Sequence, residues 1–142
     1  MILGIGTDLV EINRFALWHN YSDAQLQKIF VVSEIEQYKK LLDKKLYHQA
    51  ATFLASRYAV KEAFYKALCA AYLSIHHTSF LQGLLFVSQN SEVISDVSGV
   101  PYLRISDALY QEFCKKWYKK PLKIYSSISH EKDNALAFVV IE

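Results

Sequence analysis

The stretch RYAVKEAFYKAL (residues 57–68) decides the fold, because it lies in a long segment without proline or glycine. Between about residues 44 and 75, apolar side chains recur every three or four positions, as on the buried face of an amphipathic helix. The positions that carry this pattern are Val60, Phe64, Ala67, Leu68 and Ala71. We therefore expect one long helix at the centre of the fold.

Charged side chains gather on another face of this predicted helix. Tyr58, Glu62 and Lys66 are each four residues apart, so they line one stripe, and Arg57 and Lys61 flank it. The simplest interpretation is a solvated face with a Glu62–Lys66 ion pair, which contributes only ~0.3 to 0.5 kcal/mol. The alternative is a binding site, which would need a further polar group opposite the stripe.

The N-terminal segment contains such a group. Residues 2–12 alternate as a strand does, which puts Gly4, Gly6 and Asp8 on one face and apolar residues on the other. Glycines leave room for a ligand or another backbone beside Asp8, although a bulge would also explain them. If Asp8 meets Glu62, the two carboxylates form a typical magnesium site together with phosphate oxygens and water.

Shorter elements surround this pair. Ser22 with Gln25, and Ser33 with Glu36, have the capping-box spacing that begins a helix. After the long helix, GLLFVS (83–88), EVIS (92–95) and PYLRI (101–105) are predicted as strands, and residues 107–119 as a helix. KIYSSISH (123–130) and NALAFVVIE (134–142) are predicted to form a hairpin around residues 131–134. The fold class is therefore α+β, with an antiparallel sheet packed on one long helix.

Composition limits the organisation of the chain. With 142 residues, of which 52% are hydrophobic, we expect residues 1–142 to form a single domain. The aromatic content of 14% suggests that another subunit covers part of the apolar surface.

Cys69 and Cys114 match no disulfide or metal spacing, so we expect reduced thiols in a cytoplasmic protein. No segment has the length of a membrane-spanning helix, so we expect no membrane partner.

The net charge of +2 does not favour nucleic acid as a partner of the whole protein. Cations and aromatics alternate in KKWYKKP (115–121), as they do in proteins that bind single strands. The end of an amphipathic helix produces the same pattern, so we expect no nucleic-acid partner.

Three blocks together resemble a known family. They are GIGTDLVEINR (4–14), FLASRYAVKEAFYKAL (53–68) and SISHEKDNALAFVVIE (127–142). In order and spacing they are similar to the holo-[acyl-carrier-protein] synthase family, the small phosphopantetheinyl transferases of fatty-acid biosynthesis. The resemblance implies a phosphopantetheinyl transferase-like fold. It also implies transfer of 4'-phosphopantetheine from coenzyme A, as co-substrate, to a serine of apo acyl carrier protein, with release of adenosine 3',5'-bisphosphate.

The resemblance also implies a catalytic centre of Asp8, Glu62 and Lys66. Asp8 and Glu62 match the family's ligands of Mg²⁺, and Lys66 matches the lysine that contacts the pyrophosphate of the coenzyme. Transition-state charge on the phosphate oxygens would be stabilised mainly by electrostatics. The base that removes the serine proton is either Glu62 or a metal-bound water.

Other positions match the family's binding surfaces. Arg57, Lys61 and His130 match residues near the coenzyme, in addition to Lys66, and Arg14 matches a basic residue that meets the acidic carrier protein. The family is typically a homotrimer with each site at a subunit junction, so the resemblance implies a homotrimer here as well.

The sequence departs from the family's pattern directly after the block at residues 53–68. Cys69, Ala70 and Ala71 stand where relatives have Gly-Thr-Gly, and alanine favours continuation of the helix. Gly99-Val100-Pro101 stands for Gly-Lys-Pro and loses a cation. The loss of the glycines after Leu68 leaves a second hypothesis open, namely a noncatalytic binding or assembly protein of the same fold.

Overall fold

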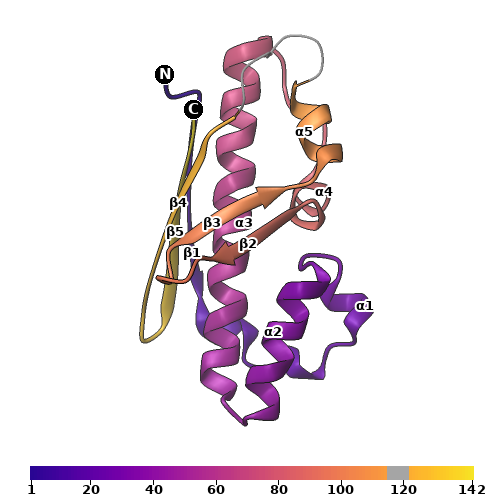
Figure 1. Ribbon diagram of the computed structural model, residues 1–142, viewed down its shortest axis with the longest axis vertical. Helices are drawn as coiled ribbons and strands as arrows, with labels where there is room; N and C mark the ends of the chain where they lie inside the picture. Colours follow the sequence, from indigo (N-terminus) through magenta and orange to yellow (C-terminus); the bar gives the residue numbers. More distant parts are fainter. Residues whose placement is uncertain (115–121) are drawn as a thin grey trace.

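The computed structural model describes residues 1–114 and 122–142. The long helix α3 (Tyr47–His76) runs the length of the molecule, with the N- and C-terminal strands on one side, the shorter helices on the other, and a further pair of strands crossing in front of it (Figure 1). In chain order the elements are β1 (Gly4–Glu11), the 3-10 helices η1 (Ile12–Phe15) and η2 (Trp18–Asn20), α1 (Asp23–Leu26), α2 (Val32–Asp43), α3 (Tyr47–His76), α4 (Leu84–Gln89), β2 (Ser91–Ser95), β3 (Pro101–Ile105), α5 (Asp107–Cys114), β4 (Ile124–Glu131) and β5 (Asn134–Ile141). The predicted α+β class is confirmed.

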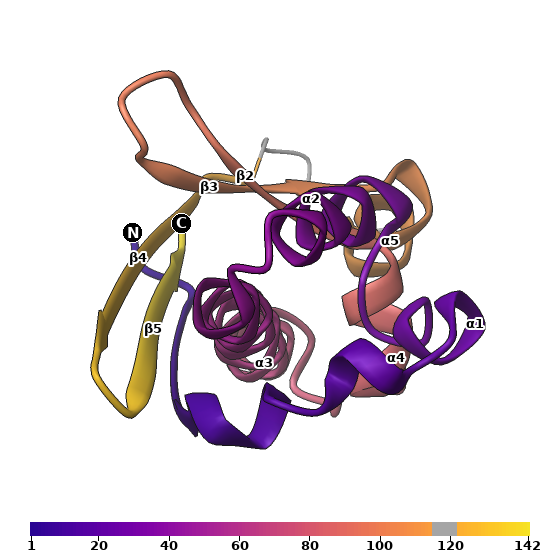
Figure 2. The ribbon, with the colours of Figure 1, turned by 90° about the horizontal axis from the view of Figure 1, so that it is seen from below.

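The main sheet has the strand order β1-β5-β4, and both strand pairs are antiparallel. Asp8 of β1 and Ile128 of β4 lie opposite Ala137 of the central strand. The predicted C-terminal hairpin is therefore confirmed, while β2 and β3 form a separate two-stranded sheet. Seen along α3, the main sheet covers one side of the helix, and α1, α2, α4 and α5 cover the other (Figure 2).

The predicted long helix is confirmed as the 30-residue α3. Because sheet and helices enclose it, α3 buries residues around much of its circumference. Cys69, Ala70 and Ala71 continue the helix, as their helix propensity predicts. The helix ends where His77 takes a left-handed conformation with φ 54°, a role that glycine usually fills.

The glycines of β1 allow the strand to pack directly on the backbone of α3. A Cβ atom on Gly6 would lie 1.9 Å from the carbonyl oxygen of Ala63, and one on Gly4 would lie 2.1 Å from that of Ala67. Neither position therefore has room for a side chain. Of the alternatives left open by the sequence, the glycine face admits another backbone, that of α3.

Two local predictions are wrong. Residues 83–88 do not form a strand, because most of this segment belongs to α4. Lys61 Nζ donates hydrogen bonds to the carbonyl of Ser88, in the last turn of α4, at 2.8 Å and to that of Ser91, the first residue of β2, at 2.6 Å. A cation at the C-terminal end of a helix stabilises it. A short apolar run fits a buried strand or a buried helix equally well.

The second error concerns the start of α2. The Ser33–Glu36 capping box does not form, because α2 begins at Val32 and Glu34 Oε2 accepts the Val31 N–H at 3.0 Å. The Ser22–Gln25 capping box is confirmed at α1. The predicted helix at residues 107–119 is confirmed up to Cys114. Its last part, the KKWYKKP segment and the side chain of Cys114 lie outside the described residues.

A buried ion pair connects α2 to α3. Lys61 Nζ lies 2.9 Å from Glu34 Oε2, and the two side chains are 1% and 0% exposed. Glu34 Oε1 also accepts the N–H of Val93 at 2.9 Å, so the carboxylate connects the start of α2 to β2.

Among the described residues, no helix has both the length and the hydropathy needed to cross a membrane.

Replacing Gly6 with alanine should lower the free energy of unfolding by about 1–3 kcal/mol or more, because the new methyl group overlaps backbone that cannot move freely. Gly83→Ala is the matched control, since a Cβ atom there meets nothing within 4 Å. Urea unfolding of both variants measures the difference. Equal midpoints would contradict the close packing of β1 on α3.

Lys61→Met should lower the free energy of unfolding by about 3–5 kcal/mol, because it leaves the Glu34 carboxylate buried without its cation. The control is Lys66→Met on the same helix, which removes a lysine that is 47% exposed and should change stability by less than about 1 kcal/mol. Thermal and urea unfolding test both variants, and similar losses of stability would refute the distinction.

Candidate active site

The first strand and the long helix bring three predicted site residues together. Lys66 Nζ lies 2.9 Å from Asp8 Oδ1 and 3.8 Å from Glu62 Oε1, and it also donates to the carbonyl of Thr7 at 3.1 Å. Asp8 follows Gly6 on the face of β1 that packs on α3, whereas Glu62 and Lys66 lie one turn apart on the helix. We call Asp8, Glu62 and Lys66 the charged cluster.

The charged cluster remains open to solvent, and its lysine is positively charged. The side chains of Asp8, Glu62 and Lys66 are 11%, 27% and 47% exposed. The hydrogen bond to Asp8 is the main cause that raises the pKa of Lys66, although partial burial opposes it. The lysine is therefore an ammonium at neutral pH, and it can exchange a carboxylate partner for an incoming anion.

The two carboxylates have the chemistry of a magnesium site that a ligand completes. A single ammonium contacts both of them, so the pair already attracts one cation. Within residues 1–114 and 122–142, no group of three or more His, Cys, Asp and Glu side chains could hold a metal. Mg²⁺ typically uses one or two carboxylates and fills its other positions with water and phosphate oxygens. Asp8 and Glu62 fit this requirement.

Tyr58 and Arg14 lie beside the charged cluster. Arg14 Nη2 donates to Tyr58 Oη at 3.3 Å, and the guanidinium carbon lies 4.7 Å from the centre of the Tyr58 ring. Burial raises the pKa of Tyr58, the hydrogen bond from Arg14 opposes the rise, and the neighbouring Glu62 carboxylate adds to it. The sequence placed Tyr58 on the same stripe as Glu62, but its contact with Arg14 was not predicted.

Arg57 and His130 line a cavity of about 360 Å³, together with His48 and Lys132. The Arg57 guanidinium lies 3.5 Å from the centre of the Phe53 ring, and its Nε is buried with no hydrogen-bond partner among the described residues. Burial lowers the pKa of Arg57 to about 10, so the group stays cationic at neutral pH. An anionic ligand would satisfy both the charge and the unpaired donor.

Lys61 belongs neither to the charged cluster nor to the lining of the cavity beside Arg57. Its ammonium is 1% exposed and is bound by Glu34 and by the carbonyls of Ser88 and Ser91. The sequence suggested that Lys61 flanks the exposed stripe, and this is incorrect because Lys61 points between α2 and α4. Its role in this structure is to hold these elements on α3.

Comparisons with known proteins show the family of the chain. A family model described as the 4'-phosphopantetheinyl transferase superfamily matches residues 4–139. A holo-[acyl-carrier-protein] synthase of Wolbachia pipientis is 37% identical over 142 residues, covering 99% of this chain and 98% of the relative.

Solved structures of the same family have a similar fold. A holo-[acyl-carrier-protein] synthase from Neisseria meningitidis is 29% identical, with a TM-score of 0.72 over 100% of this chain and 99% of that one. A synthase from Bacillus anthracis, described as a complex with CoA (3',5'-ADP), is 29% identical, with a TM-score of 0.66 over 99% and 96%. The chain therefore belongs to the holo-[acyl-carrier-protein] synthase family, within the 4'-phosphopantetheinyl transferase superfamily.

Proposed function

We propose that this protein is a Mg²⁺-dependent holo-[acyl-carrier-protein] synthase of fatty-acid biosynthesis. The observation that carries the proposal is the charged cluster, in which Lys66 contacts both Asp8 and Glu62 at the edge of β1. A noncatalytic relative would have no need for two carboxylates and a lysine at these places. The family membership agrees with the proposal.

In the proposed reaction, the hydroxyl oxygen of a carrier serine attacks the pantetheine-side phosphorus of coenzyme A. A new phosphorus–oxygen bond to serine forms, and the bond from the same phosphorus to the bridging oxygen of the pyrophosphate breaks. Adenosine 3',5'-bisphosphate leaves with that oxygen, and the serine proton is lost to a base. Negative charge grows on the bridging and equatorial oxygens, so electrostatic stabilisation is the main requirement.

The charged cluster would meet this requirement. Asp8 and Glu62 would hold Mg²⁺, which when bound supplies positive charge to the phosphate oxygens. Lys66 would transfer its hydrogen bond from Asp8 to the pyrophosphate, which its exposure allows. Glu62 would act as a metal ligand, as the base for the serine proton, or as both.

The cavity lined by Arg57 and His130 would receive another part of the coenzyme. Arg57 and His130 line it, and the unpaired buried Nε of Arg57 favours an anion such as a nucleotide phosphate. Arg57 and Lys66 are nine residues apart, or roughly 14 Å along a helix axis. We do not assign Lys61 to the coenzyme, because its ammonium is already bound inside the protein.

The carrier protein would dock on the η1 side of the charged cluster. Arg14 lies there on the surface, next to Tyr58, in the 3-10 helix η1 that directly follows β1. Carrier proteins of this type are acidic, so an exposed guanidinium steers their approach and fixes their orientation.

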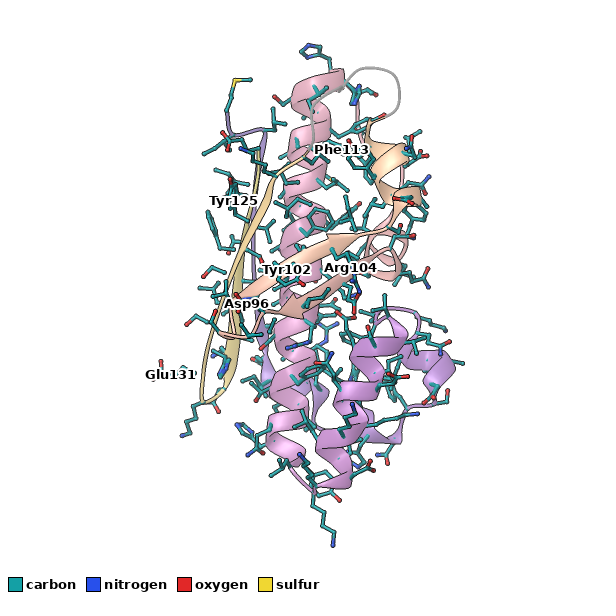
Figure 3. The ribbon with its side chains drawn as sticks, viewed as in Figure 1. Asp96, Tyr102, Arg104, Phe113, Tyr125 and Glu131 are labelled. Carbon is teal, nitrogen blue, oxygen red and sulfur yellow. The ribbon has the colours of Figure 1, made fainter. Side chains whose placement is uncertain are left out.

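We also propose a homotrimer in which the outer face of the main sheet is buried. Five large apolar side chains on this face are between 43% and 66% exposed: Ile5, Leu9, Tyr125, Leu136 and Phe138. Tyr125, for example, points away from α3 (Figure 3). An apolar patch of this kind typically marks a subunit interface.

We further propose that residues 1–142 act as one transferase domain in the cytoplasm, where the soluble coenzyme and carrier meet.

Intact-mass spectrometry of an apo acyl carrier protein, incubated with this protein, coenzyme A and Mg²⁺, tests the proposed function. The carrier should gain the mass of one phosphopantetheine, and a chelator should abolish the gain. No gain with several carrier proteins, from a protein shown to be folded, would favour the noncatalytic binding protein instead.

Glu62→Gln should reduce the transfer rate by about 10²-fold or more, because it removes the charge that serves as metal ligand or base while nearly preserving shape. Initial rates followed by the same mass assay measure the loss, and unchanged thermal unfolding shows that the fold is intact. A rate within twofold of the wild type would exclude both roles of Glu62.

Leu9→Glu should dissociate the proposed trimer, because it places a charge in the centre of the apolar sheet face. Leu81→Glu is the control, since Leu81 is 91% exposed and does not belong to the sheet. Sedimentation equilibrium should give a trimer for the wild type and the control, and a smaller species for Leu9→Glu. A monomeric wild type would contradict the assembly.

A further inference from the structure

Arg14 is held on one side by aromatic rings. Its guanidinium carbon lies 4.7 Å from the centre of the Tyr58 ring and 5.7 Å from that of Phe15, and Nη2 donates to the Tyr58 hydroxyl at 3.3 Å. Stacking on the ring and a hydrogen bond to its hydroxyl together restrict the planar guanidinium to few orientations.

The positive charge of Arg14 is not neutralised within the described part of the chain. No carboxylate of residues 1–114 or 122–142 lies within ion-pair distance of it, whereas Lys39, Lys61, Lys66 and Arg104 each have such a partner. The tyrosine hydroxyl is a neutral acceptor, so it fixes the direction of the guanidinium without cancelling its charge. The remaining donors of the fork can therefore bind a carboxylate from another molecule.

Tyr58 is itself firmly placed. Its side chain is 9% exposed, its ring lies 5.5 Å from that of Phe15, and it stands one helical turn before Glu62. The hydroxyl therefore lies between the surface arginine and the charged cluster. A phenylalanine at this position would fill nearly the same space but would offer no acceptor to Arg14.

We propose that Tyr58 is a positioning residue, which holds Arg14 so that it binds an acidic group of the carrier protein next to the charged cluster. This inference rests on the proposed function, because it assumes that an acyl carrier protein is the partner. The energetic effect passes from the Tyr58 hydroxyl through Arg14 to the carrier. Tyr58 itself need not touch carrier or coenzyme.

A double-mutant cycle tests the inference. Tyr58→Phe, Arg14→Ala and the double variant are compared with the wild type in their KM for apo carrier protein, their KM for coenzyme A, and their dissociation constant for fluorescently labelled apo carrier. Tyr38→Phe is the matched control, because it removes the hydroxyl of another buried tyrosine, on α2 and outside the site. Thermal unfolding of every variant is measured alongside.

Tyr58→Phe should raise the carrier KM and the carrier dissociation constant by about threefold to tenfold, the usual effect of one hydrogen bond. The KM for coenzyme A should change less. With alanine at position 14, the same substitution should change carrier binding by less than about twofold, because its effect depends on Arg14. Tyr38→Phe should leave carrier binding unchanged.

Two results for the Tyr58→Phe variant would overturn the inference. Tyr58→Phe could leave carrier binding unchanged, or it could weaken binding equally with arginine or alanine at position 14, which would show that Tyr58 does not act through Arg14. Failure of the proposed function is distinguishable, because the wild type would then bind carrier without modifying it, and the binding cycle would still decide the role of Tyr58. A wild type that does not bind carrier at all would refute the inference as well.

Discussion

The site depends on the close approach of β1 to α3. Gly4 and Gly6 lie on the backbone of the helix at Ala63 and Ala67, where even a methyl group would collide with carbonyl oxygens. This approach brings Asp8, the next residue on the same strand face, within hydrogen-bond distance of Lys66. A strand with larger side chains would stand several ångströms farther away, and Asp8 would then not reach the helix. The core packing and the chemistry of the site thus share one cause.

Two lysines on α3 show how environment determines the role of the same residue type. Lys61 and Lys66 are five residues apart and both contact carboxylates, but only Lys66 is exposed. Breaking the buried pair would leave an uncompensated charge in the core, which costs several kcal/mol. The exposed contacts contribute about 1 kcal/mol or less, so an anionic substrate can replace them. Stability is concentrated in the pair at Lys61, and exchangeable charge is left at Lys66.

Much of this architecture could be predicted because it rests on repeating patterns. The two-residue alternation predicted β1, and the polar turn at residues 131–134 predicted the C-terminal hairpin. The helical spacing of apolar residues in a segment without glycine or proline predicted α3. The charged stripe could be predicted from the four-residue spacing of a helix. The burial of Lys61 could not, because its partner Glu34 is 27 residues away in the sequence and meets it only in the tertiary structure. The apolar segment of α4 was ambiguous because six residues carry too little periodicity. The contact of Arg14 with Tyr58 likewise depends on a turn that no local pattern specifies.

We propose that Asp8 and Glu62 act as one cation site beside Lys66. Anomalous diffraction from crystals grown with coenzyme A and Mn²⁺, a substitute for Mg²⁺, tests it most directly. One metal peak per chain, bound by carboxylate oxygens of both Asp8 and Glu62, with Lys66 on a phosphate of the coenzyme, is the predicted result. A metal bound elsewhere, or a coenzyme bound while Lys66 still pairs with Asp8, would contradict the account.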